Sequence, residues 1–257
     1  MASEALFGKS EPVLELPQTD SRSSKKRLGQ ISFGTFLENT SGTIWTGEIY
    51  MGKLFKMDLV YDTGSDWMVV EGSECETCEG SNYNIELSLQ TGIAEQLTEE
   101  VSEREYGRAS LKGKEYTDTV CILFSTCVEH FEFFLIEEQV GLKEPIDGLM
   151  GMARNNKYHL LPEVGDIVGP LYVEALYENG LIPENKFSFF FTEAGYDSWV
   201  DFGEPKLDNV REDASLVDVQ LIEEDFFWAG YCQGVAFRDT SEDNSYSFGR
   251  INQFETE

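Results

Sequence analysis

The strongest constraint on this fold is a series of short runs of β-branched and aromatic residues, divided by turns that carry glycine. The first two runs, residues 44–50 and 54–61, are joined by Met51-Gly52-Lys53. This spacing predicts a β-hairpin that enters a larger sheet. Further strands are predicted at residues 68–71, 115–124, 131–136, 187–192 and 198–202. We therefore expect a mainly β protein.

Helix signals are fewer, and the best lies at residues 170–179. This segment has Pro170 near its start, Leu171 and Leu176 on one helical face and Gly180 just past its end. Proline is favoured in the first turn of a helix and glycine just after the last turn. The sequence therefore predicts one short helix among the strands.

The composition fits a folded protein with a high negative charge. Of its 257 residues 41% are hydrophobic and 13% aromatic, which is enough for a core. A formal charge of −29 repels phosphate backbones and anionic membrane surfaces, so we expect no nucleic-acid partner. The charge fits either ordinary solubility or a protein that works at low pH, where protonation relieves self-repulsion.

The five cysteines form two close pairs, Cys75 with Cys78 and Cys121 with Cys127, together with Cys232. Both pairs are disulfide candidates, which would imply an oxidising compartment. The first pair could also hold zinc, but no second Cys or His pair follows at ligand spacing, so we expect no metal. No apolar run approaches the ~18 residues of a membrane span, and residues 1–12 lack an apolar secretory signal.

A small polar turn stands between two apolar runs, residues 57–61 and 67–70. It consists of Asp62, Thr63, Gly64 and Ser65. A carboxylate there would lie in an apolar setting, with hydroxyl groups beside it and a glycine that lets the backbone approach closely. An isolated Asp-Thr-Gly triplet is most often a solvated turn, so its context must decide.

That context resembles the pepsin-like aspartic proteases. The matching segments are residues 45–52 (opening hairpin), 60–65 (first active-site loop), 75–78 (short disulfide loop), 106–113 (flap hairpin), 146–153 (apolar segment beside the active-site loop) and 180–203 (crossing into the second lobe). They occur in the family's order and cover roughly residues 44–237. Each match is weak alone, and together they are strong.

The resemblance implies a bilobal pepsin-like acid protease fold with a complete N-terminal lobe and a partial C-terminal lobe. Residues 1–43 would be an N-terminal extension of propeptide type. Residues 44–190 would form the N-terminal lobe with the active-site loop and flap, and residues 191–257 part of the C-terminal lobe.

The same resemblance suggests roles for individual residues. Asp62 would be the first catalytic aspartate, in the loop that Thr63, Gly64 and Ser65 complete. Tyr106 and Gly107 would form the flap that closes over the substrate, and we interpret Asp147 as structural. Substrates would be polypeptides, and no cofactor is expected.

The largest departure from the family concerns the second catalytic aspartate. A second Asp-Thr-Gly or Asp-Ser-Gly is absent, and Asp239-Thr240-Ser241 is interpreted as a surface turn. Because residues 231–237 resemble the strand before the second loop, we expect a chain truncated before that aspartate and a longer full product. The completed protein is expected to be a monomer, and a functional dimer is not favoured.

Two functions remain open at this point. One is an aspartic endopeptidase that hydrolyses peptide bonds through a water activated by Asp62. The other is a non-catalytic, protease-like peptide-binding protein or fragment. The family suggests a secretory, lysosomal or vacuolar acidic compartment, which the sequence of residues 1–12 does not support.

Overall fold

The computed structural model describes residues 32–39, 44–107, 109–142, 146–154, 169–192, 198–210, 212–222 and 227–232. Its strands are β1 (Phe33–Asn39), β2 (Trp45–Met51), β3 (Phe55–Asp62), β4 (Met68–Glu71), β5 (Glu95–Gln96), β6 (Ser102–Tyr106), β7 (Ala109–Leu123), β8 (Thr126–Val140), β9 (Gly148–Gly151), β10 (Phe187–Phe190) and β11 (Ser198–Phe202). The helices are α1 (Ile85–Thr91), α2 (Tyr172–Glu178) and the 3-10 turn η1 (Leu207–Asn209). The prediction of a mainly β protein is confirmed.

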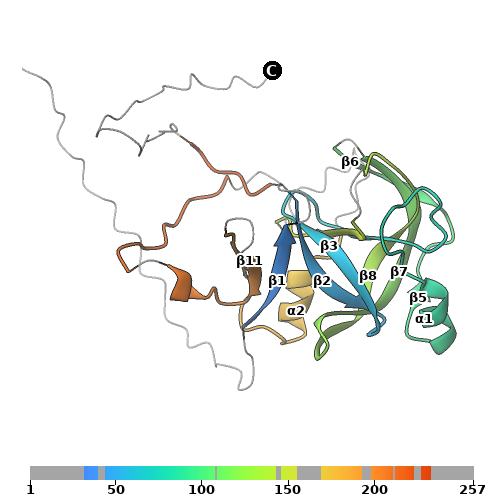
Figure 1. Ribbon diagram of the computed structural model, residues 1–257, viewed down its shortest axis with the longest axis horizontal. Coiled ribbons are helices and arrows are strands. Elements are labelled where there is room, and N and C mark those ends of the chain that lie inside the picture. The colour runs from blue at the N-terminus through green and yellow to red at the C-terminus, as the bar shows by residue number, and fades with distance from the viewer. Residues whose placement is uncertain are drawn as a thin grey trace, which may run out of the picture.

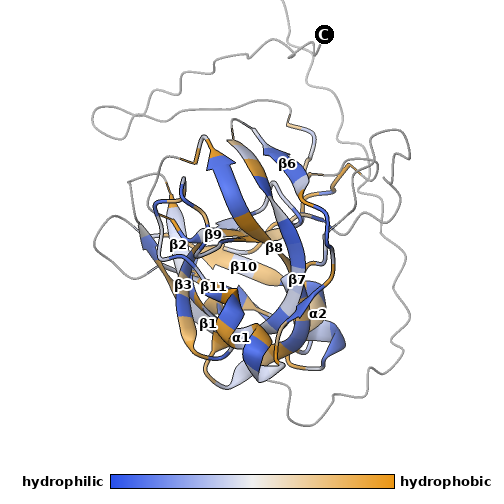
Figure 2. Ribbon diagram, turned by 90° about the vertical axis from the view of Figure 1, so that its right-hand side faces the viewer, coloured by the Kyte–Doolittle hydropathy of each residue, from blue (hydrophilic) through white to orange (hydrophobic). Residues whose placement is uncertain are grey.

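The strands form one sheet in the order β10-β11-β1-β2-β3-β9-β4-β8-β7-β5, with β6 paired to β7. An additional pairing of β2 with β7 closes the part from β2 to β7 into a barrel. Figure 1 shows the long β7–β8 hairpin on one side of the molecule and β1, β2 and β11 on the other. The strand β10 forms the free edge of this path and is largely apolar (Figure 2).

The predicted hairpin is confirmed as β2 and β3, which pair antiparallel from Thr46 with Val60 to Met51 with Phe55. Its turn needs left-handed backbone at Gly52 (φ 54°) and Lys53 (φ 67°). Glycine adopts this conformation without a steric cost, which explains its place in the turn.

The core has two parts, which lie on either side of the barrel wall. The larger cluster includes Leu59, Phe133 and Phe202, and α2 packs onto it through Tyr172. The Tyr172 hydroxyl donates to the Val120 carbonyl at 2.8 Å, and its ring meets Phe131 edge-on. The predicted helix is therefore confirmed as α2, and apolar contact holds it in place.

The smaller cluster lies beneath the β6–β7 hairpin. Its buried members are Trp67, Val69, Cys75, Ala109, Leu111, Phe134, Ile136, Ile146 and Leu149. These residues come from four strands and three loops, so the cluster ties the hairpin to the strand that follows the Asp62 turn.

Several elements were missed by the sequence analysis, among them β1, β5, β9 and α1. The strand β1 lies inside residues 1–43, the expected extension, and pairs with both β2 and β11. The helix α1 is only seven residues long and buries just Ile85 and Ser88, so its apolar periodicity is weak. At least residues 33–39 therefore belong to the sheet, whereas the two proposed domain boundaries stay predictions.

Candidate active site

The Asp62 turn is held from behind by the end of β9. Strands β3 and β9 run parallel, with Asp62 opposite Gly151. The amides of residues 151–153 donate in turn to the carbonyls of Trp67 (3.0 Å), Asp62 (2.7 Å) and Ser65 (2.9 Å). Three backbone hydrogen bonds across this short loop fix the path of its backbone. The carboxylate of Asp62 therefore projects from a rigid frame.

The close approach of these segments requires glycine at position 151. A Cβ there would lie 2.3 Å from the carbonyl carbon of Asp66 and 2.7 Å from the amide nitrogen of Trp67. These neighbours are backbone atoms, which cannot rotate away as a side chain would. The resemblance placed residues 146–153 beside the active-site loop, and the structure puts them there.

The carboxylate of Asp62 is partly buried at the end of β3. Its Oδ1 accepts a hydrogen bond from the Gly64 amide at 2.9 Å, while Thr63 and Gly64 are exposed. Ser65 is buried, and within the described parts of the chain its hydroxyl has no hydrogen-bond partner. The turn therefore presents one oriented carboxylate and keeps a second polar group close to it.

The segment predicted to be the flap forms a hairpin of β6 and β7. Tyr106 pairs with Ala109, and Gly107 between them has φ 54°. Burial raises the pKa of Tyr106 well above its ordinary value, Arg104 lowers it, and the charges of Asp66 and Asp62 raise it. The Tyr106 hydroxyl thus lies within electrostatic range of the Asp62 turn, and its flap role stays a prediction.

Arg104 is a site residue that the sequence analysis missed. Its guanidinium carbon lies 3.8 Å from the Trp67 ring centroid and 4.5 Å from that of Phe134. One of its nitrogens donates to Glu115 at 2.6 Å, and both side chains are largely buried, at 15% and 13% exposure. A cation stacked on aromatic faces and paired with a carboxylate fastens the flap strand to the residue that follows the Asp62 turn.

The other face of this region is closed by Gly169. Its amide donates to Asp66 Oδ2 at 2.7 Å, and a Cβ at this position would lie within 2.6–2.8 Å of the Trp67 ring. Asp66 is therefore occupied in holding the segment before α2.

The chain after β11 also reaches the loop. The indole nitrogen of Trp228 donates to the Met152 carbonyl at 2.9 Å, and its ring meets Phe187 edge-on at 5.6 Å. Arg154 donates to the Ile222 carbonyl at 2.6 Å. Ile222 and Trp228 therefore contribute contacts to the back of the frame around Asp62.

Both predicted disulfides form, Cys75–Cys78 and Cys121–Cys127. The second joins β7 to β8 at paired positions, and the first closes a short loop after β4. Asp147 accepts backbone hydrogen bonds from Asp58 (2.6 Å) and Ser81 (2.5 Å), as a structural residue would. A chelating group of three or more His, Cys, Asp or Glu side chains does not occur within the described residues.

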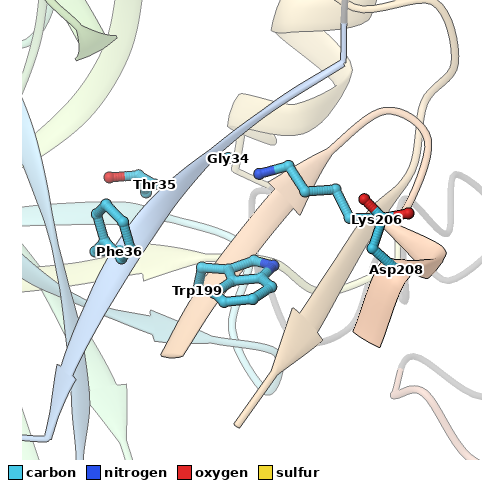
Figure 3. A pocket seen from close by; sticks show the side chains of 6 residues that line it. All are labelled: Gly34, Thr35, Phe36, Trp199, Lys206 and Asp208. Atoms are coloured by element: carbon cyan, nitrogen blue, oxygen red, sulfur yellow. The ribbon is translucent and has the colours of Figure 1, made fainter. Parts of the chain in front are cut away.

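A pocket of about 330 Å³ lies elsewhere, on the outer side of β1 and β11 (Figure 3). It is lined by Gly34, Thr35, Phe36, Trp199, Lys206 and Asp208. None of the predicted site residues lines it. Lys206 pairs with buried Asp201 at 3.3 Å, and the exposed carboxylate of Asp208 also lines the pocket, so its charged groups are separate from those of the Asp62 turn.

Comparison with known proteins decides the family. A family model described as eukaryotic aspartyl protease matches residues 44–251, which is most of the chain. The chain belongs to the eukaryotic aspartyl protease family. Membership supports a proteolytic function in general and agrees with the ordered frame around Asp62.

Solved structures give the same fold. The crystal structure of the aspartic proteinase from Irpex lacteus matches with a TM-score of 0.53 at 19% sequence identity. The match covers 68% of this chain and 49% of that chain, so this aspartyl protease spans about half the length of its structural neighbour. The fold is thus a partial pepsin-like fold. No curated protein matches by sequence.

Within the described residues no helix of this aspartyl protease is long and apolar enough to cross a membrane. Asp239, which the sequence analysis assigned to a surface turn, lies outside the described residues.

Proposed function

We propose that this chain carries the first catalytic half-site of an aspartic endopeptidase, with Asp62 as the residue that activates water. The observation that carries the proposal is the frame of the Asp62 turn. Residues 151–153 hold its backbone from behind, the Gly64 amide orients its carboxylate, and its charge acts on the pKa of Tyr106 near the tip of the β6–β7 hairpin. A family model over residues 44–251 supports the same assignment.

The reaction divides two roles between carboxyl groups. An ionised carboxylate accepts a proton from water as that water attacks the peptide carbonyl, and a protonated partner donates a hydrogen bond to the developing oxyanion. Two close carboxyl groups share one proton because both cannot ionise cheaply. Asp62 can fill one of these roles, and the hydroxyl of Ser65 can support its carboxylate.

The substrate would be an extended polypeptide that lies between the Asp62 turn and the flap. Tyr106 and Gly107 stand at the tip of the β6–β7 hairpin, and strand backbone there can hydrogen-bond to an extended chain. No cofactor enters this chemistry.

The second candidate function is peptide binding without hydrolysis. It is favoured by the presence of a single Asp-Thr-Gly triplet, at residues 62–64, in the 257 residues. Asp66 does not offer a ready partner, because Gly169 already occupies one of its oxygens.

The test is peptide hydrolysis at about pH 3 to 5, below the range in which an ordinary histidine acts as a base. The variants are Asp62→Asn and a matched control, Asp208→Asn, whose exposed carboxylate lines the pocket of Figure 3. Hydrolysis that disappears with Asp62→Asn and persists with Asp208→Asn supports the endopeptidase. Peptide binding without any turnover supports the second candidate, and hydrolysis that survives Asp62→Asn contradicts the proposal.

A further inference from the structure

Two buried carboxyl groups lie where β4 ends and β9 begins, at the far end of these strands from the Asp62 turn, and the proposed function uses neither of them. Glu71 at the end of β4 is 1% exposed, and Asp147 just before β9 is 4% exposed. The amides of adjacent residues hold them: Gly80 donates to Glu71 Oε2 at 2.7 Å, and Ser81 donates to Asp147 Oδ1 at 2.5 Å. The two carboxyl groups therefore meet at one turn of the chain.

The position of Gly80 shows how close the groups are. A Cβ on this residue would lie 2.7 Å from Glu71 Oε2 and 2.7 Å from Asp147 Oδ1. The backbones are joined as well, since the Glu71 amide donates to the Asp147 carbonyl at 2.9 Å. Two like charges at this separation in a buried site repel strongly, so the pair is expected to keep a proton.

Both carboxyl groups accept backbone amides. The oxygens of Asp147 accept those of Ser81 and Asp58. Glu71 accepts the Gly80 amide, and the backbone of Glu79 also hydrogen-bonds to it. At Glu71, burial and the negative charge of Asp147 outweigh these donors and favour the protonated form.

Among the described residues, the charged side chains near Glu71 are acidic or are paired with other groups, and none of the salt bridges involves Glu71. On the disulfide loop the nearby charge is Glu79, which is exposed, and on β3 it is Asp58, which lies 3.7 Å from Lys56. The charged residues of β8 next to the Glu71 pairing are engaged on β7, Glu137 with Lys114 and Glu138 with Lys112. Burial raises the pKa of Glu71 to about 7, the Gly80 amide lowers it, and Asp147 and Glu79 raise it.

We propose that Glu71 is a pH-sensitive latch. While its carboxyl group is protonated, the disulfide loop, residues 72–83, packs against the strands that frame Asp62, and ionisation of this buried group beside Asp147 favours an opened loop that admits water to the carboxylate. The loop is attached to this frame through Gly80 and Ser81, through the Gly72 amide to Ile136, and through the Tyr83 amide to Glu71. Loss of the Gly80 contact would free the middle of the loop beside Asp147, which precedes β9.

The direction of the effect follows from proton binding. The unfolded chain releases the Glu71 proton near pH 4.5, whereas the folded chain keeps it until about pH 7. Between these values the native state binds more protons, so stability falls as the pH rises. Below about pH 4.5 Glu71 makes its full contribution to stability, and above about pH 7 no further stability is lost through this group.

The test compares thermal unfolding of the full chain between pH 4.5 and 8 for the native protein, Glu71→Gln and Glu76→Gln. Glutamine keeps an acceptor for the Gly80 amide but cannot ionise. Glu76→Gln removes an equal charge from an exposed position of the same loop, which controls for the self-repulsion of a chain of net charge −29. We expect Tm to fall with pH in the native protein and the control, by roughly 5–10 °C more than in Glu71→Gln.

An equal fall of Tm in all three proteins would overturn the latch. If Glu71→Gln does not fold, amide hydrogen exchange of the native protein decides instead. The amides of Gly80 and Ser81, corrected for the intrinsic rate, should lose protection between pH 5 and 8, while Tyr116 and Phe133 in the β7–β8 hairpin keep theirs. Unchanged relative protection would also overturn the proposal. Neither measurement requires hydrolysis, so the result does not depend on the proposed function.

Discussion

Arg104 lies over the indole ring of Trp67, with its guanidinium carbon 3.8 Å from the ring centroid. This contact joins the flap strand to the residue that follows the Asp62 turn, and Glu115 on β7 pairs with the same guanidinium. The flap is therefore anchored by a charged side chain inside an otherwise apolar cluster. Because a buried charge needs its partner, the anchor is sensitive to substitution.

Arg104→Met should lower the free energy of unfolding by about 3 kcal/mol, because it leaves the carboxylate of Glu115 buried without its cation. The measurement is urea unfolding at neutral pH. Lys114→Met is the matched control, since its pair with Glu137 is more exposed and worth about 1 kcal/mol or less. Equal losses in the two variants would show that burial does not strengthen the Arg104 pair.

Gly151→Ala should destabilise the protein and displace the Asp62 turn. The new Cβ would meet the backbone of Asp66 at 2.3 Å, and overpacking of this kind costs about 1–3 kcal/mol. Gly230→Ala is the control, since its Cβ would come no closer than 3.3 Å to Val219. Thermal unfolding measures the loss, and a Gly151→Ala protein as stable as the control would contradict the close approach.

Much of the fold could be predicted from the sequence because its signals are local. The hairpin of β2 and β3, the strands β4 and β11 and the helix α2 each carry their own apolar pattern and turn residues. The strand β1 does not, although it pairs with both β2 and β11. Its seven residues include Gly34, Glu38 and Asn39, types that strands disfavour, so its local pattern is weak.

The candidate site was predictable only where local sequence motifs mark it. Asp62 and Tyr106 stand in short motifs, and the order of these motifs along the chain indicates the family. Arg104 lies in the polar run 102–106, which suggests an exposed strand, and its burial depends on aromatic rings from Trp67 and Phe134. Charged residues that are buried by distant partners cannot be identified from local patterns.

Removal of the second disulfide should cost more stability than removal of the first. The Cys121–Cys127 bridge closes a loop of six residues and Cys75–Cys78 a loop of three. Chain entropy assigns about 2.2 and 1.6 kcal/mol to loops of these lengths, so the expected difference is small. Urea unfolding of the two Cys→Ala double variants measures it, and a larger loss for Cys75→Ala with Cys78→Ala would point to packing of that loop instead.

Tyr106→Phe should lower activity and leave the free energy of unfolding nearly unchanged. Burial raises the pKa of Tyr106, so its hydroxyl stays a hydrogen-bond donor throughout the acidic and neutral range. If the flap acts on substrate as proposed, loss of this donor lowers kcat/KM on the order of 10-fold, by the same factor at pH 3 and pH 5. The free energy of unfolding should change by about 1.5 kcal/mol or less, since a single hydroxyl is lost. Tyr177→Phe on α2, whose side chain is 44% exposed, is the control and should leave both quantities unchanged. An unaltered kcat/KM in Tyr106→Phe would contradict a role of the Tyr106 hydroxyl in substrate binding. The role of Asp62 is tested separately, by Asp62→Asn.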